Sequence, residues 1–130
     1  MSSPVIRFRI DFSDQVYLGP GKIALLEAVR DCGSLSQAAR TLRMSYRRAW
    51  LLLANVNASF TAPVTVSKTG GKGGGGVAVT EFGNELIGGY RALEADIARI
   101  ATKQLRAIVC SVRPQASDAE PARRSLARKQ

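Results

Sequence analysis

The chain has 130 residues, 45% of them hydrophobic, which is enough for one domain with a modest core. Its 19 Lys and Arg against 10 Asp and Glu give a net charge of +9, and this excess of positive charge favours an anionic partner. Histidine, the commonest metal ligand and general base, is absent, and neither paired carboxylates nor an activated nucleophile appear. The sequence therefore predicts neither an enzyme nor a metal or cofactor site.

The apolar segments are too short for a membrane protein. The longest runs fall far below the ~20 residues that a membrane-spanning helix requires. Met1 to Asp11 lacks the basic segment and the apolar run of a secretion signal. We therefore expect a cytoplasmic protein without a membrane partner.

The chain opens with an expected strand and an expected helix. Val5 to Phe12 alternates apolar and polar side chains, a pattern typical of a half-buried strand, and Asp14 marks a turn. Pro20 suits the first turn of a helix, and apolar residues follow it at helical spacing. Gly33 is expected to end this helix, as glycine commonly does.

Serine caps predict two more helices. Ser34 is placed to cap a short helix from Leu35 to about Leu42. Ser45 is placed to cap a third helix that runs to about Phe60. Three consecutive helices are therefore expected before the middle of the chain.

A glycine-rich run separates two short β-prone segments. Val64 to Lys68 and Val77 to Thr80 flank Gly70 to Gly76, which indicates a hairpin around a flexible tip. The run lacks the ending of a nucleotide P-loop and does not lead into a helix, which argues against nucleotide binding. We expect a wing whose Lys72 lies against a nucleic-acid backbone, with a merely flexible hairpin as the alternative.

A long last helix is expected over residues 81–109, capped by Thr80. Its apolar residues follow heptad-like spacings of 4, 3, 4 and 3, which predict a homodimer seam, with packing on its own domain as the alternative. The predicted seam residues are Leu86, Tyr90, Leu93, Ile97 and Ile100. Residues 1–109 are expected to form one domain with this dimerisation helix, and residues 110–130 a basic, disordered tail.

Three helices followed by a hairpin predict a winged helix-turn-helix, a mainly α fold with a small β-hairpin wing. The string GSLSQAARTLRMS, from Gly33 to Ser45, resembles the DNA-binding motif of LysR-type regulators. The continuation resembles the N-terminal domain of the ModE-type molybdate-responsive repressors. The features that carry this resemblance are the string SYRRAW, which begins at Ser45, then Asn57, the glycine run, Thr80 and Gly83. The resemblance covers about Gly19 to Ile108.

This resemblance implies a nucleoid-associated, sequence-specific regulator that binds double-stranded DNA as a homodimer. In particular, it implies a repressor linked to molybdate transport or molybdenum metabolism. One alternative is a sensor of an oxyanion such as molybdate. Full-length members of the family carry separate oxyanion-binding domains, none is expected in the roughly twenty residues after Val109, and the sequence shows no such site elsewhere. A second alternative is a sequence-neutral architectural DNA-binding protein, which the basic tail favours and the helix-turn-helix disfavours.

Positive charge is concentrated between positions 40 and 72, where six Lys and Arg and no Asp or Glu occur. On a helical wheel centred on Ala49, Leu53 falls on the core face, whereas Arg47 points fully outward. Arg48 and Trp50 flank the core face. The N-terminal side chains of a recognition helix face the major groove, where arginine can bond guanine or phosphate.

The hypothesis assigns DNA contacts to both helices of the motif and to the hairpin. The start of the second helix is expected to hold a phosphate, with simple capping as an alternative or additional role for Ser34. For Trp50, and for Tyr46 at the edge of the core face, both core packing and DNA contact remain open. The predicted DNA-binding residues are Ser34, Ser36, Gln37, Arg43, Ser45, Tyr46, Arg47, Arg48, Trp50, Lys68 and Lys72.

Leu51 departs from the resembled family, which implies a polar or acidic residue at this position. It lies next to Arg47, one turn earlier, where an acid could restrain the arginine and a leucine does not. Contact with a thymine methyl group and contact with a partner surface both remain open for Leu51. The target sequence of the family is therefore not carried over.

Overall fold

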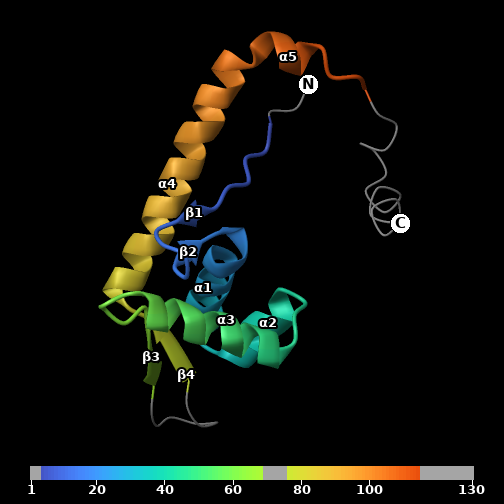
Figure 1. Cartoon of the computed structure of the whole chain (residues 1–130). Coiled ribbons are helices and arrows are strands. Elements are labelled where there is room, and N and C mark those ends of the chain that lie inside the picture. The colour runs from blue at the N-terminus through green and yellow to red at the C-terminus, as the bar shows by residue number, and fades with distance from the viewer. Residues whose placement is uncertain (1–3, 69–75, 115–130) are drawn as a thin grey trace. The chain divides into compact units, whose positions relative to one another are not determined.

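A computed structural model describes residues 4–68 and 76–114. The chain divides into two units, Ile6–Ile97 and a smaller unit of Met1–Val5 with Ala98–Gln130. The elements in chain order are β1 (Ile10–Asp11), β2 (Tyr17–Leu18), α1 (Pro20–Cys32), α2 (Leu35–Thr41), α3 (Tyr46–Ser59), β3 (Thr65–Lys68), β4 (Gly76–Val79), α4 (Glu81–Gln104) and α5 (Arg106–Cys110) (Figure 1). The predicted mainly helical winged helix-turn-helix fold is confirmed.

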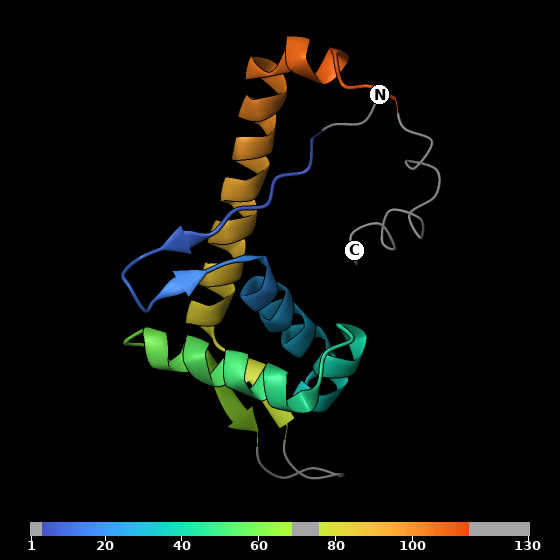
Figure 2. The ribbon, with the colours of Figure 1, turned by 45° about the vertical axis from the view of Figure 1, so that its right-hand side comes forward.

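In the larger unit α1, α2 and α3 pack around the main apolar core, and Leu18, Ile23 and Tyr90 form a second buried cluster. α1 contacts both α2 and α3, and α2 contacts α3. Figures 1 and 2 both show the β3–β4 hairpin extending from beneath α3. The fully buried large side chains of this core come from α1, α3 and the segment before β3: Leu25, Leu26, Val29, Val56 and Val64.

The boundaries of the first three helices follow local signals in the sequence. A proline opens α1, and Gly33 ends it with a φ of 71°, in the left-handed region that favours glycine. The hydroxyl of Ser34 accepts a hydrogen bond from the Gln37 N–H at 3.3 Å. The hydroxyl of Ser45 accepts one from the Arg48 N–H at 3.0 Å. Both predicted serine caps are therefore confirmed.

The predicted hairpin is present as β3 and β4, which pair antiparallel from Thr65 opposite Val79 to Lys68 opposite Gly76. Its glycine-rich tip, with Lys72, lies outside the described residues. The Val77 N–H donates to the Gly33 carbonyl at 3.1 Å, which joins β4 to the end of α1. The hairpin is therefore tied to the start of the helix-turn-helix.

The first strand is much shorter than the sequence pattern predicts. The strand expected over Val5–Phe12 is reduced to β1, which pairs over two residues with β2. The alternation of half-buried and exposed side chains holds as far as Asp11, but Phe12 is 56% exposed. A strand is stabilised only where a neighbour supplies ladder hydrogen bonds, and β2 is only two residues long.

The last helix is interrupted near its end. In place of one helix over 81–109, α4 ends at Gln104 and α5 follows after Leu105, whose ψ of 19° leaves the helical region. Near this end the Thr102 hydroxyl donates to the Ala98 carbonyl at 2.8 Å, a bond of the kind that often bends helices. Neither α4 nor any other helix in the described part of the chain could span a membrane.

Candidate nucleic-acid interface

The tight turn between α2 and α3 sets the helix-turn-helix. Arg43 in this turn has a φ of 57°, and its N–H donates to the Arg40 carbonyl at 3.1 Å. The N–H of Met44 donates to the Ala39 carbonyl at 3.0 Å. These two bonds reverse the chain within a few residues and leave the Arg43 side chain exposed at the junction of the two helices.

The outward placement of the two arginines on α3 is confirmed. Ala49 is completely buried and Leu53 is only 8% exposed, so the opposite face of the helix is fixed in the core. Arg47 and Arg48 are both exposed beside the capped first turn. The helix N-terminus adds the partial positive charge of its free N–H groups to these side chains. This end of α3 is therefore strongly positive.

Two aromatic side chains on α3 are exposed to solvent. Tyr46 is 56% exposed and Trp50 is 53% exposed, which settles the choice between core packing and exposure for both. The helical wheel puts Tyr46 at the edge of the core face, and this expectation is wrong. A wheel assumes that neighbours cover that face along the whole helix, whereas Tyr46 is its first residue.

The start of α2 combines a cap with exposed polar groups. The hydroxyl of Ser34, besides capping the helix, lies 3.1 Å from that of Ser36. Ser36 and Gln37 are exposed, and Ser34 is half-buried. The capping role of Ser34 is confirmed, and phosphate contact by this group stays a prediction.

Two open hollows flank the outward side of α3. The larger, of about 370 Å³, lies between residues of α3 and the side chains of Tyr17 and Lys22. The smaller, of about 310 Å³, is lined by Tyr46 and Trp50. Arg47 and Leu51 line both hollows. These two residues therefore form a ridge between the hollows, which we call the α3 ridge.

A buried lysine connects α3 to the rest of the unit. Lys22 on α1 is 2% exposed, and its Nζ donates to Asn55 Oδ1 of α3 at 2.5 Å and to the Tyr17 carbonyl at 3.1 Å. It also lies 3.4 Å from the centre of the Tyr17 ring. Burial, together with the charge of Arg9, lowers the pKa of this ammonium group. No local pattern identified Lys22, because its partners lie on other elements.

Asn57 joins α3 to the hairpin. Its Oδ1 accepts hydrogen bonds from the N–H groups of Val64 at 2.9 Å and Thr65 at 3.0 Å, and its Nδ2 donates to the Thr65 hydroxyl at 2.8 Å. The resemblance quoted above includes Asn57 but assigns it no role. The structure shows that it fixes the beginning of β3 against the C-terminal end of α3.

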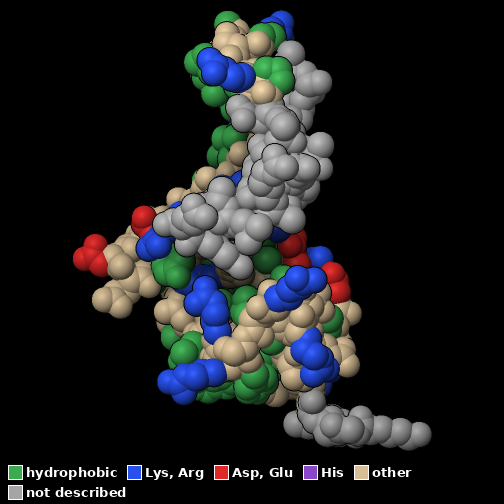
Figure 3. Space-filling model, turned by 90° about the vertical axis from the view of Figure 1, so that its right-hand side faces the viewer, with side chains coloured by type: hydrophobic (Ala, Val, Ile, Leu, Met, Phe, Trp, Pro, Cys, Tyr) green, Lys and Arg blue, Asp and Glu red, His purple; other side chains and the backbone are tan. Residues whose placement is uncertain are grey.

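The β3–β4 hairpin carries a positive charge at the end of β3. Lys68, the last residue of β3, is exposed. Figure 3 views the molecule from the side on which α2 lies in Figure 1. It shows Lys and Arg side chains spread over this face with apolar side chains between them, and some Asp and Glu side chains nearby. Such a mixture of cations and apolar groups suits a surface that meets both phosphates and base edges.

The expected dimer seam is divided between buried and exposed residues. Tyr90 is 3% exposed, stacks on Phe8 with ring centres 4.4 Å apart, and donates to the Phe8 carbonyl at 2.6 Å. Burial, together with the charge of Glu94, raises the pKa of its hydroxyl. Leu86 packs against both parts of the core. These two residues therefore pack on their own unit, and Phe8, just before β1, covers Tyr90. The remaining seam residues are half-buried or exposed: Leu93, Ile97 and Ile100.

Comparison with known proteins identifies relatives for about two thirds of the chain. The chain is 41% identical to the molybdenum-pterin-binding protein MopB of Rhodobacter capsulatus over 83 residues, which are 64% of this chain and 31% of MopB. It is 34% identical to the transcriptional regulator ModE of Haemophilus influenzae over 94 residues, 72% of this chain and 37% of that protein. It is 33% identical to the DNA-binding transcriptional dual regulator ModE of Escherichia coli over 88 residues, which are 68% of this chain and 34% of that protein.

The chain spans about a third of the length of these relatives. No protein-family model matches it. The names of the relatives describe regulators and a binding protein and not enzymes, in agreement with the expectation from the sequence. The chain is therefore homologous to the N-terminal region of the ModE transcriptional regulators.

Proposed function

We propose that the chain binds double-stranded DNA sequence-specifically, with α3 in the major groove and the β3–β4 hairpin beside the backbone. The main support is the exposure of Arg47 and Arg48 at the start of a helix whose opposite face is fixed in the core. Arginine at this position of a recognition helix can form two parallel bonds to guanine or bind phosphate. Homology to the N-terminal region of ModE supports the same function.

Within this proposal, the chain is a cytoplasmic, nucleoid-associated repressor of genes for molybdate transport or molybdenum metabolism. The support is the naming of relatives as regulators and as molybdenum transport proteins. The names of MopB and MopA describe those two proteins as molybdenum-pterin-binding proteins. For this chain we propose DNA as the ligand.

We further propose that two copies act together through α4. Leu93 is 40% exposed and Ile100 is 48% exposed, and both face solvent at seam positions. A dimer would present two copies of α3 to half-sites about one helical turn apart. Sedimentation tests this step, because a chain that stays monomeric at micromolar concentration, both free and on DNA, contradicts it.

Selection of bound sequences from random duplexes, followed by affinity measurements on the selected and on scrambled duplexes, tests DNA recognition. We expect a clear preference for the selected sequence. Arg47→Ala should reduce this discrimination by about 1–3 kcal/mol. Lys68→Ala should weaken all duplexes similarly and lower the salt slope by about one. Arg7→Ala, the same charge change at an exposed site outside the helix-turn-helix, is the matched control.

Each competing function gives a different result in this assay. Equal affinity for selected and scrambled DNA, with strong salt dependence, would show a sequence-neutral architectural protein. A change of DNA affinity on adding molybdate, with stoichiometric molybdenum bound to the chain, would show that it senses the oxyanion itself. Preference for one sequence that is unaffected by Arg47→Ala would contradict the assigned orientation of α3.

A further inference from the structure

Three large apolar or aromatic side chains are exposed next to each other on α3. Tyr46, Trp50 and Leu51 are 56%, 53% and 50% exposed. Tyr46 and Trp50 are one helical turn apart, and Leu51 is one turn from Arg47. Single exposed apolar residues are common on protein surfaces, but a contiguous group within one helix is typical of a binding surface.

Leu51 lies between the two hollows on this surface. Together with Arg47 it forms the α3 ridge, because both residues line the two hollows on either side. Leu53, two residues further along the same helix, is only 8% exposed in the core, so the exposure of Leu51 follows from its place on the outward face. A helix that enters a groove with this face places the α3 ridge nearest to the floor of the groove.

The charges around Leu51 favour DNA as the occupant of this surface. The neighbouring exposed side chains of the motif include Arg43, Arg47 and Arg48, and no Asp or Glu occurs in the sequence between positions 40 and 72. Apolar groups beside cations, in two hollows whose described lining includes no Asp or Glu, match a polyanion that also offers an apolar contact. The major groove of DNA offers one such contact at base edges, the C5-methyl group of thymine.

On this basis we infer that Leu51 contacts the methyl group of a thymine and so adds a specific base to the recognition sequence. The inference rests on the proposed function and deepens it. Residues four apart on a helix have Cβ atoms about 5–6 Å apart. Successive bases of one DNA strand rise by about 3.4 Å. The thymine contacted by Leu51 should therefore lie one or two base pairs from the base contacted by Arg47.

Replacing single thymines by deoxyuridine tests this inference, because the exchange removes only the methyl group. The duplex is the sequence selected by the full chain, and dissociation constants are measured for each substituted position. At one position of the site, deoxyuridine should weaken binding about fourfold, the loss expected for one methyl group removed from contact. Leu51→Ala should bind the thymine and deoxyuridine duplexes equally at that position.

Two control variants keep the test specific. Leu51→Met retains apolar contact and should keep the methyl dependence. Val5→Ala trims an apolar side chain that is 73% exposed in another segment of the chain and should also keep it. Since Leu51 is exposed, all of these variants should keep the melting temperature of the wild type.

The outcomes separate the inference from the function on which it rests. A chain that selects a sequence but tolerates deoxyuridine at every position overturns the contact with thymine and leaves DNA recognition intact. Methyl dependence that survives in Leu51→Ala assigns the contact to another residue and also overturns the inference. A chain that selects no sequence overturns the proposed function, and the inference with it.

Discussion

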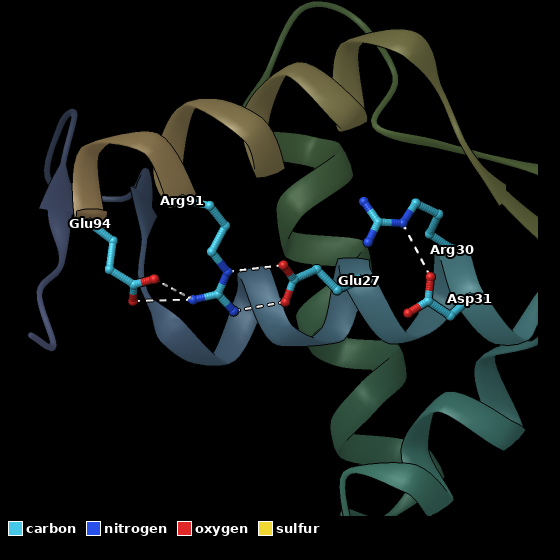
Figure 4. A network of polar contacts seen from close by, with 5 residues as sticks. All are labelled: Glu27, Arg30, Asp31, Arg91 and Glu94. Carbon is cyan, nitrogen blue, oxygen red and sulfur yellow. Dashed lines mark hydrogen bonds and ion pairs between the residues drawn. The ribbon is translucent and has the colours of Figure 1, made fainter. Parts of the chain in front are cut away.

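Arg91 on α4 donates two parallel hydrogen bonds to Glu27 on α1, from Nε to Oε2 at 2.9 Å and from Nη2 to Oε1 at 2.7 Å (Figure 4). Its Nη1 also donates to both carboxylate oxygens of Glu94, at 2.9 and 3.1 Å. The bond from Arg91 lowers the pKa of the Glu27 carboxyl, and the bonds to the two carboxylates raise the pKa of Arg91. One guanidinium thus joins the middle of α4 to the helix that leads into the helix-turn-helix.

Glu27→Gln should lower the free energy of unfolding by about 1 kcal/mol at pH 7, because it replaces charge-assisted bonds at a partly exposed site. Since folding lowers the pKa of Glu27, its contribution is fully present above the ordinary pKa and is lost as the pH falls through the lowered value. Urea unfolding of wild type and variant should therefore converge at acid pH. Glu85→Gln, at an exposed position on α4, is the control, and an equal loss in it would contradict this account.

Two glycines on α4 should respond in opposite ways to alanine. A Cβ on Gly83 would lie 2.6 Å from Cγ1 of Val79 and even closer to the Val64 carbonyl, whereas a Cβ on Gly88 meets nothing within 4 Å. Gly83→Ala should cost about 1–3 kcal/mol through overpacking. Gly88→Ala should add about 0.5–1 kcal/mol through helix propensity. Thermal melting of the two variants tests the difference, and equal shifts would show that the hairpin does not press on α4.

Arg43 has an unfavourable backbone conformation and also a proposed DNA contact. Two substitutions distinguish the effect of the backbone on stability from the effect of the side chain on DNA binding. Its φ of 57° is unfavourable for any residue with a Cβ by about 1–2 kcal/mol. Arg43→Gly should therefore be more stable than Arg43→Ala by about 1 kcal/mol in chemical unfolding. Both variants should lose DNA affinity by the same factor, because both remove the same charge. Unequal DNA affinities would mean that the turn, and not the side chain, controls binding.

Local signals were sufficient for the features that lie within one segment. Ser34 and Ser45 each stand directly before a helical pattern, and each caps the helix that follows. The helical period around Ala49 shows which face of α3 is buried. Features that depend on contacts between distant segments were missed. The ammonium of Lys22 is bound by β2 and α3, and no sequence pattern around it reports those partners.

The same limit explains why the predicted strand is too long and why the burial of Tyr90 at a seam position was not foreseen. A heptad-like spacing shows that one face of a helix is apolar but not what covers it, and Phe8 covers Tyr90 from the other end of the chain. The alternation before β1 shows burial on one side but not whether a partner strand exists. The helical period places Leu51 on the outward face of α3, but it does not show what contacts an exposed side chain.

Asn57 should be a sensitive polar residue of α3, because its Oδ1 accepts hydrogen bonds from two backbone N–H groups at the beginning of β3. Asn57→Ala leaves the partly buried N–H groups of Val64 and Thr65 without this acceptor and should cost about 1–3 kcal/mol in urea unfolding. Asn57→Asp keeps an acceptor for both groups and replaces the amide donor by a carboxylate oxygen, to which the Thr65 hydroxyl can donate. It should therefore recover most of the lost stability at neutral pH. If Asn57→Asp is as unstable as Asn57→Ala, the acceptor role assigned to Asn57 is wrong.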